Sequence, residues 1–184
     1  FSTTVSAAAK PGGAWLGVDP QREWAKVPRM KGDPEILDIL NNLLTHELTA
    51  INQYFIHHKM LLDWGYKKLS DKKRAESIEE MQHADEVIDR ILFFDGVPNM
   101  QRLNPVKVGE DPVEQHKLDL ELELEAVANL KKGIEICLKK ADVGTRALLE
   151  KILVDEEEAI DWLETQLHLV DELGKSAYLA EHLE

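Results

Sequence analysis

The stretch "GVPNMQRLNPVKVGED", residues 96–111, decides between the folds that this sequence allows. It holds two prolines and two glycines, which interrupt any helical pattern. On both sides of it the chain consists of long helical patterns separated by short breaks. The stretch therefore predicts a long, ordered connection between two pairs of helices rather than a tight turn.

Two long helices are expected before this connection. Asp33 can cap a helix with Pro34 at its first position, and apolar residues then recur at three- and four-residue spacing until Gly65. A second helical pattern begins near Ser70 and runs to Asp95. The break between them is short, so the two helices should lie side by side.

The third helix has the clearest start. Asp111 is a cap residue, Pro112 follows it, and Glu114 stands three positions after the cap, which is the pattern of a capping box. The pattern predicts a helix to about Lys140.

A fourth helix is expected over roughly residues 143–173, with Gly174 as its C-cap, and "KSAYLAEHLE" (175–184) is amphipathic enough for a short fifth. The predicted fold class is all-α: a four-helix bundle with a long crossover between helices two and three and a short fifth helix. A purely structural bundle is the alternative, and the residues that the helices place inside decide between the two readings.

Charge and composition limit the classes of partner that this protein can bind. The 184 residues contain 35 Asp and Glu against 22 Lys and Arg, a formal net charge of −13, which argues against nucleic acid or an anionic membrane as partner. No apolar run approaches the roughly 18 residues of a membrane-spanning helix. The single cysteine, Cys137, excludes an internal disulfide and a CxxC metal site.

Acidic residues recur on the apolar faces of the predicted helices. Glu47 and Glu123 each lie among apolar residues of the first and third helices. The second helix offers Glu80 and His83, three residues apart and therefore neighbours on one face, and the fourth offers Glu156. Glu80 follows Glu47 by 33 residues, and Glu156 follows Glu123 by 33, so the two halves of the chain share one register.

Four inward carboxylates and a histidine are the arrangement with which a bundle holds two iron or manganese ions. Zinc would more usually have additional His or Cys ligands. A glutamate three residues before a histidine is weak evidence alone, because Glu is abundant in this chain. The shared register of the two halves carries the prediction.

From Met30 to its end the chain resembles bacterioferritin, the haem-containing branch of the ferritins. The segments that carry the resemblance are "MKGDPEILDILNNLLTHELTAINQYF" (30–55), "DWGYKKLSDKKRAESIEEMQHADEVIDRIL" (63–92), "DGVPNMQRL" (95–103) and "DEEEAIDWLETQL" (155–167). The resemblance implies a ferritin-like bundle, a cage of 24 subunits, a di-iron ferroxidase site in each bundle and b-type haem shared between pairs of subunits across a two-fold axis.

By this resemblance Glu47, Glu80 and His83 match the ligands of one iron. Glu123 and Glu156 match ligands of the other, and Glu80 and Glu156 are the bridging carboxylates. The implied reaction is oxidation of Fe(II) by dioxygen or peroxide, followed by storage of ferric mineral in the cage.

Met81 matches the axial haem ligand. One residue along a helix is a rotation of about 100°, so Met81 faces outward if Glu80 and His83 face inward. A partner subunit would then offer its own Met81 to the same haem. The plainer alternative is a methionine that fills a subunit interface. Tyr54 matches the tyrosine beside the iron centre.

Ala159 departs from the family, which has a second histidine there. Glu157 and Glu158 project about 200° and 100° away from it and cannot substitute without distorting the helix. Ferroxidase activity is therefore expected to be weakened. The alternative is a non-catalytic haem-bearing subunit in a mixed cage whose partner chain has a complete site, and a third reading is an assembly component that uses the fold as a scaffold.

Six other histidines fall at no site position of the repeat and are expected to be mostly solvated or at interfaces. They are His46, His57, His58, His116, His168 and His182. Cys137 is expected to be a small buried residue.

Residues 1–29 precede the resemblance and divide the chain into an arm (1–29) and the bundle domain (30–184). The first eighteen residues contain no acid and are rich in Ser, Thr and Ala, which is typical of what remains of an organelle presequence. The mitochondrial matrix is the expected location and a bacterial cytoplasm the alternative. Trp15, Leu16 and Trp24 are expected to dock the arm on protein, and a plain tail is the other reading.

Overall fold

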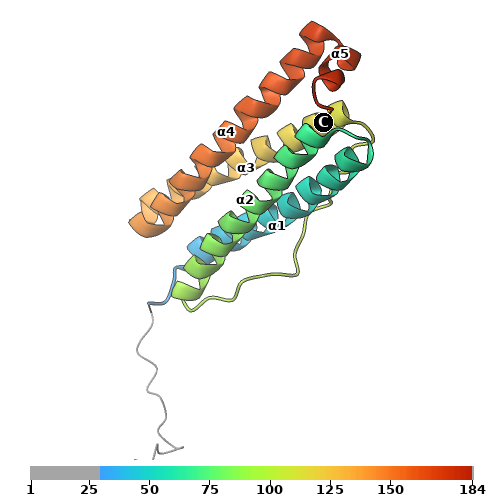
Figure 1. Ribbon diagram of the computed structural model, residues 1–184. Coiled ribbons are helices and arrows are strands. Elements are labelled where there is room, and N and C mark those ends of the chain that lie inside the picture. Colours follow the sequence, from blue (N-terminus) through green and yellow to red (C-terminus); the bar gives the residue numbers. More distant parts are fainter. Residues whose placement is uncertain (1–29, 184) are drawn as a thin grey trace, which may run out of the picture.

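The computed structural model describes residues 30–183, and the expected docking arm lies outside this range. Two antiparallel pairs, α1 with α2 and α3 with α4, form a bundle, and α5 folds back beside the end of α4 (Figure 1). The elements are α1 (Pro34–Asp63), α2 (Lys67–Phe93), α3 (Pro112–Lys140), α4 (Val143–Leu173) and α5 (Lys175–Ala180). The predicted four-helix bundle with a long crossover and a short fifth helix is confirmed. Within the described range no helix combines the length and apolarity of a membrane crossing.

Capping residues place two of the helix starts where the sequence predicts them. The Asp33 carboxylate accepts a hydrogen bond from the Glu35 N–H (2.9 Å), and Asp111 caps the start of α3 in the same way. The capping box at α3 is shifted by one residue. The Glu114 carboxylate accepts from the N–H of Glu110 (2.6 Å) rather than from that of Asp111.

The start of α2 differs from the prediction. The helix begins at Lys67, about one turn before Ser70, and Tyr66 caps it without a side-chain hydrogen bond. The Ser70 hydroxyl is instead 2.8 Å from His58 Nδ1 on α1, and Leu69 is buried beside Leu61. Packing against α1 thus uses a serine that looks like a cap in the sequence.

A polar stripe on α1 holds the crossover. Its five residues stand four positions apart: Asn41, Thr45, Thr49, Gln53 and His57. Their side chains accept, in this order, hydrogen bonds from Asn99, Arg102, Asn104, Lys107 and Gly109. Each step of four residues turns about 40° around the helix, so the stripe winds about 160° across α1. It leads the chain from the end of α2 to the start of α3.

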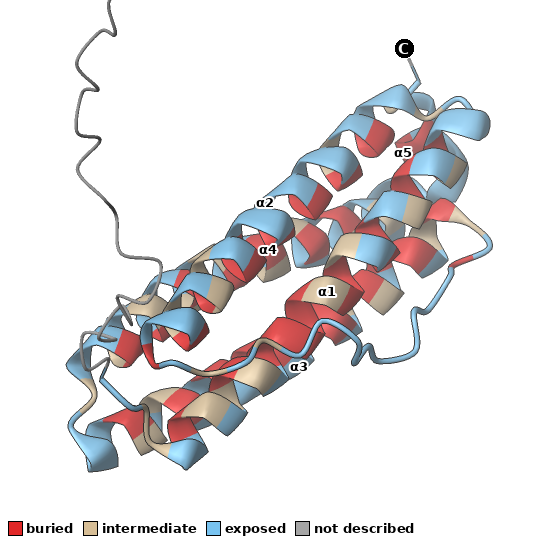
Figure 2. Ribbon diagram, turned by 90° about the horizontal axis from the view of Figure 1, so that it is seen from below, coloured by how far each residue is buried: buried red, intermediate tan, exposed pale blue. Residues whose placement is uncertain are grey.

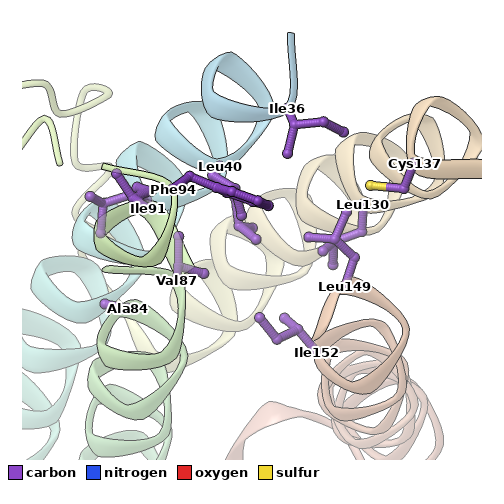
Figure 3. Close-up of a cluster of buried hydrophobic side chains, with 12 residues drawn as sticks. Ile36, Leu40, Ala84, Val87, Ile91, Phe94, Leu130, Cys137, Leu149 and Ile152 are labelled. Atoms are coloured by element: carbon purple, nitrogen blue, oxygen red, sulfur yellow. The ribbon is translucent and has the colours of Figure 1, made fainter. Parts of the chain in front are cut away.

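The main hydrophobic core lies toward the end of the bundle where α1 and α4 begin (Figure 3). Side chains of all four long helices meet there, and Cys137 is buried among them as predicted. Figure 2 shows buried residues continuing along the inward faces of the helices. Beyond this core many of the buried residues are polar or charged, and they form the candidate site.

Candidate metal centre

Each long helix contributes one buried carboxylate to the middle of the bundle. The relative exposures of Glu47, Glu80, Glu123 and Glu156 are 0%, 4%, 0% and 2%. They stand on the same inward stripes as the apolar core residues, which is why the helical periodicity singled them out. Burying four carboxylates is expensive unless cations or hydrogen bonds compensate them.

His83 brings three of these carboxylates together. Its Nδ1 lies 3.3 Å from Glu80 Oε2, 3.5 Å from Glu156 Oε1 and 3.7 Å from Glu47 Oε2. The four residues each offer one ligand atom within 4.8 Å of the others. The structure thus places together four of the five residues that the sequence predicts.

Glu123, the fifth, stands just outside this group. The Tyr54 hydroxyl donates a hydrogen bond to its Oε1, while its Oε2 has no hydrogen-bond partner among the described residues. The charge of Glu156 acts on it strongly. Tyr54 is fully buried, and its hydrogen bond places it beside Glu123.

Burial and mutual repulsion raise the pKa values of these carboxyl groups. For Glu80 desolvation is the largest cause and the charge of Glu47 the next, and for Glu123 desolvation is followed by Glu156. Burial would lower the pKa of His83, but the nearby carboxylates of Glu156, Glu47 and Glu80 raise it well above its ordinary value. The carboxylates around His83 thus favour a positive charge at this point.

The donor set fits a divalent cation. Both carboxylate oxygens of Glu47, one of Glu123 and one of Glu156 are buried without a hydrogen-bond partner among the described residues. Such atoms are rare in folded proteins and call for an ion or ordered water. Oxygen donors with one imidazole suit iron or manganese.

Asp155 is part of this centre, and the sequence did not indicate it. Its Oδ2 lies 3.2 Å from Nε2 of His83, on the side of the ring away from the glutamates. A carboxylate that accepts the second N–H of a ligating histidine fixes the tautomer and orientation of its ring. In the acidic run 155–158 Asp155 looks like one more solvated residue, which is why the pattern gave no signal.

Ala159 is buried, one turn after Glu156. A methyl group offers no ligand atom, so the second half of the centre has Glu123 and Glu156 but no counterpart of His83.

The expectation for the remaining histidines was wrong for four of them within the described chain. His46, His57, His58 and His116 are at most 8% exposed. Three of them have polar partners far away in the sequence, as His57 has in Asp119 and His116 in Tyr178, and such pairs leave no local pattern. The Nε2 of His46 has no hydrogen-bond partner among residues 30–183, and burial lowers the pKa of this ring while Glu156 opposes that shift.

A second cluster of buried charges lies next to the centre. Lys73 and Asp119 are both fully buried, with Nζ 2.8 Å from Oδ2, and His57 Nδ1 is 2.9 Å from the other carboxylate oxygen. The Lys73 ammonium also lies 5.1 Å from the ring centres of both Tyr54 and Trp162. Despite desolvation, Lys73 and His57 hold the pKa of Asp119 well below its usual range.

Met81 faces out of the bundle, as its rotation from Glu80 and His83 predicts. It is 46% exposed and lines an open groove with Ile78, Gln82, Asp85 and Glu86. The thioether is thus presented on the outside of the bundle, beside the exposed side chain of Ile78.

Comparisons with known proteins agree with this geometry. The ferritin-like domain family matches residues 37–173. The chain is 51% identical over 152 residues to bacterioferritin of Mycobacterium bovis, covering 83% of this chain and 96% of the relative. It is 50% identical over 155 residues to that of Streptomyces coelicolor, covering 84% and 93%. The solved structure of Mycobacterium tuberculosis bacterioferritin BfrA superposes with a TM-score of 0.83 at 50% identity, covering 84% of this chain and 98% of that one.

Proposed function

The chain belongs to the bacterioferritin branch of the ferritin family, and we propose that it stores iron as a subunit of a ferritin cage and oxidises Fe(II) inside its own bundle. One observation carries this proposal. Glu47, Glu80, His83 and Glu156 come from three helices and converge on one buried point, with Glu123 of the fourth helix beside them. A purely structural bundle has no reason to bury carboxylates that lack partners.

The residues of the centre have different roles in binding Fe(II). The glutamates supply negative charge in a site shielded from water, where attraction for a cation is strongest. His83 presents Nδ1 to the substrate ion, and Asp155 holds the ring in that orientation through Nε2. Entry of Fe(II) displaces the protons that His83 and the glutamates hold, so binding releases protons and weakens as the pH falls.

Ala159 weakens the second metal position, because only Glu123 and Glu156 remain to bind there. Fast oxidation by dioxygen needs two Fe(II) ions held together to give up electrons as a pair. The chain alone should therefore oxidise Fe(II) more slowly than a subunit with a complete site. This deficit also supports the second candidate, a haem-bearing subunit of a mixed cage that relies on a ferroxidase-competent partner chain.

Restoring the imidazole tests the first candidate against the second. Ala159→His should raise the initial rate of Fe(II) oxidation by about tenfold or more, because ligand loss costs at least as much as the roughly 10- to 100-fold typical of outer-shell loss. The measurement is the growth of ferric absorbance in purified full-length protein. A wild-type chain that already oxidises Fe(II) rapidly at two equally occupied positions would remove the main support for the mixed cage.

Haem is proposed to bind between two subunits, each contributing Met81. When bound, haem would carry electrons between the surface and the stored iron. Met81→Leu keeps the side-chain volume and removes the thioether, so the cage should assemble while the haem Soret band is lost. Leu92, exposed on the same helix, offers a control as Leu92→Met, which should leave the Soret band unchanged. Full haem occupancy in Met81→Leu would exclude Met81 as the ligand.

A cage of 24 subunits with two-fold haem-sharing dimers remains part of the proposal, as does any second ferritin-type chain. The relatives named above are bacterial, which supports the bacterial cytoplasm over the mitochondrial matrix. The mitochondrial placement stays a prediction that these relatives do not support.

A further inference from the structure

His46 is a buried group that the centre described above does not use. It is 3% exposed, and its Nε2 has no hydrogen-bond partner in the described part of the chain. Burying a polar atom without a partner costs free energy, so an unpartnered ring nitrogen inside a bundle requires a compensating role.

The position of His46 on α1 directs it toward the second half of the bundle. It stands seven residues before Gln53 and eleven before His57, which are close to two and three whole turns. Gln53 and His57 both contact Asp119 of α3. His46 therefore lies on the α3 side of α1, while its neighbour Glu47 points into the centre.

Position links His46 to the second metal position. It directly precedes the centre's Glu47, and Glu123 lies on α3, the helix that this side of α1 faces. His46 is not among the four residues whose ligand atoms lie within 4.8 Å of one another. Its side chain must therefore turn before it can reach an ion in the centre.

Within the described bundle, Ala159 leaves the second metal position one ligand short, and the Nε2 of nearby His46 is unused. We infer that His46 supplies the nitrogen ligand that Ala159 cannot, turning its ring from α1 onto an ion held by Glu123 and Glu156. This inference rests on the proposed function. The substitution is partial, because the ring must leave its resting position, so Ala159→His still improves the site.

The test counts tightly bound ions without using iron oxidation. Metal-free, full-length protein is loaded with Co(II), which stays divalent in air at these ligands, and the ions retained after desalting are counted per subunit. Wild type should retain two ions. His46→Leu, which preserves apolar volume, should retain one, with the affinity for the second reduced by about tenfold or more. His168→Leu, at an exposed histidine of α4, is the control and should retain two.

A rescue variant separates ligation from packing. In the double variant His46→Leu/Ala159→His the new imidazole should restore the second ion, whereas damage caused by lost packing would persist. In zinc-loaded crystals of the wild type, His46 Nε2 should lie about 2.1 Å from the second ion.

Each outcome decides one claim. Equal ion counts and affinities in wild type and His46→Leu would overturn the role of His46, and so would failure of Ala159→His to rescue a correctly folded double variant. If the wild type retains no ion at all, the proposed function fails. If the first ion binds normally and the affinity for the second is unchanged in His46→Leu, this inference is refuted and the proposed function stands.

Discussion

Two groups of buried charges lie side by side in this bundle, and they are balanced in opposite ways. Around Asp119, the ammonium of Lys73 and the ring of His57 satisfy a single carboxylate, whose pKa is lowered. Around His83, the carboxylates outnumber the cation, several of their oxygens have no hydrogen-bond partner in the described part of the chain, and their pKa values are raised. In the first group the fold itself supplies the cation that the carboxylate needs, whereas the second has more carboxylates than cations until a metal ion binds.

The contrast separates charges that stabilise the fold from charges kept for binding. Removing one member of a balanced pair leaves an uncompensated charge, whereas removing one member of a crowded set relieves repulsion. The same kind of substitution should therefore change stability in opposite directions in the two groups. Three measurements test this.

The largest effect is expected for Lys73→Met. Asp119 would remain buried with only His57 and the neutral amide of Gln53 as partners, and breaking a buried ion pair costs about 3–5 kcal/mol of unfolding free energy. Lys67→Met, on the same helix, is the matched control. Its ammonium is exposed and pairs with the exposed Asp71 one turn away, so the loss should stay below about 1 kcal/mol. Urea unfolding at fixed protein concentration measures both, and equal losses would show that the pair of Lys73 and Asp119 is not special.

The second-largest effect is expected at low pH, where the contribution of Asp119 to the stability of the fold is lost. Its folded pKa lies below the ordinary value of 3.8, so its stabilisation is fully present above that pH and is lost as the pH falls through the folded pKa. The loss should amount to about 2 kcal/mol, as for a comparable salt-bridged Asp. The stability difference between wild type and Lys73→Met/Asp119→Leu should stay constant from pH 7 to 5 and shift against wild type below pH 3.8. A shift already complete at pH 5 would contradict the lowered pKa.

The smallest effect should have the opposite sign. Glu80→Gln in metal-free protein should raise the free energy of unfolding at pH 7 by less than Lys73→Met lowers it, because the neutral amide removes a charge that desolvation and Glu47 disfavour. The folded pKa of Glu80 lies above its ordinary value of 4.5, so the gain should shrink as the pH falls and vanish below 4.5, where Glu80 is protonated whether folded or not. Destabilisation of the metal-free protein would show that Glu80 is structurally balanced. With metal present, the variant should lose most of the stabilisation that metal gives the wild type.

The sequence predicts the helices and the inward glutamates because both depend on local signals. Asp33, Asp111 and Gly174 mark helix ends, and helical spacing places Glu47 and Glu123 on apolar faces. The start of α2 was misplaced because Ser70 carries a capping signal but bonds to His58 across the bundle.

Local sequence signals do not identify contacts between residues on different helices. Lys73 stands between Lys72 and Arg74 in a run typical of a solvated face, yet it is fully buried. Asp155 is hidden in the same way within an acidic run. In both cases the deciding partner lies on another helix and dozens of residues away, Asp119 for Lys73 and His83 for Asp155, so only the fold identifies it.

The polar stripe on α1 also limits how the crossover can change in length. Most surface connections accept inserted residues at small cost, because loop closure depends only weakly on length. The crossover is held to α1 by five hydrogen bonds, which residues from Asn99 to Gly109 donate. One inserted residue would shift every later hydrogen-bond donor of the crossover relative to its acceptor on α1, because the acceptors stand four residues apart from Asn41 to His57. In a chimaera with a related bundle, α1 and the crossover would therefore have to be exchanged together as one unit.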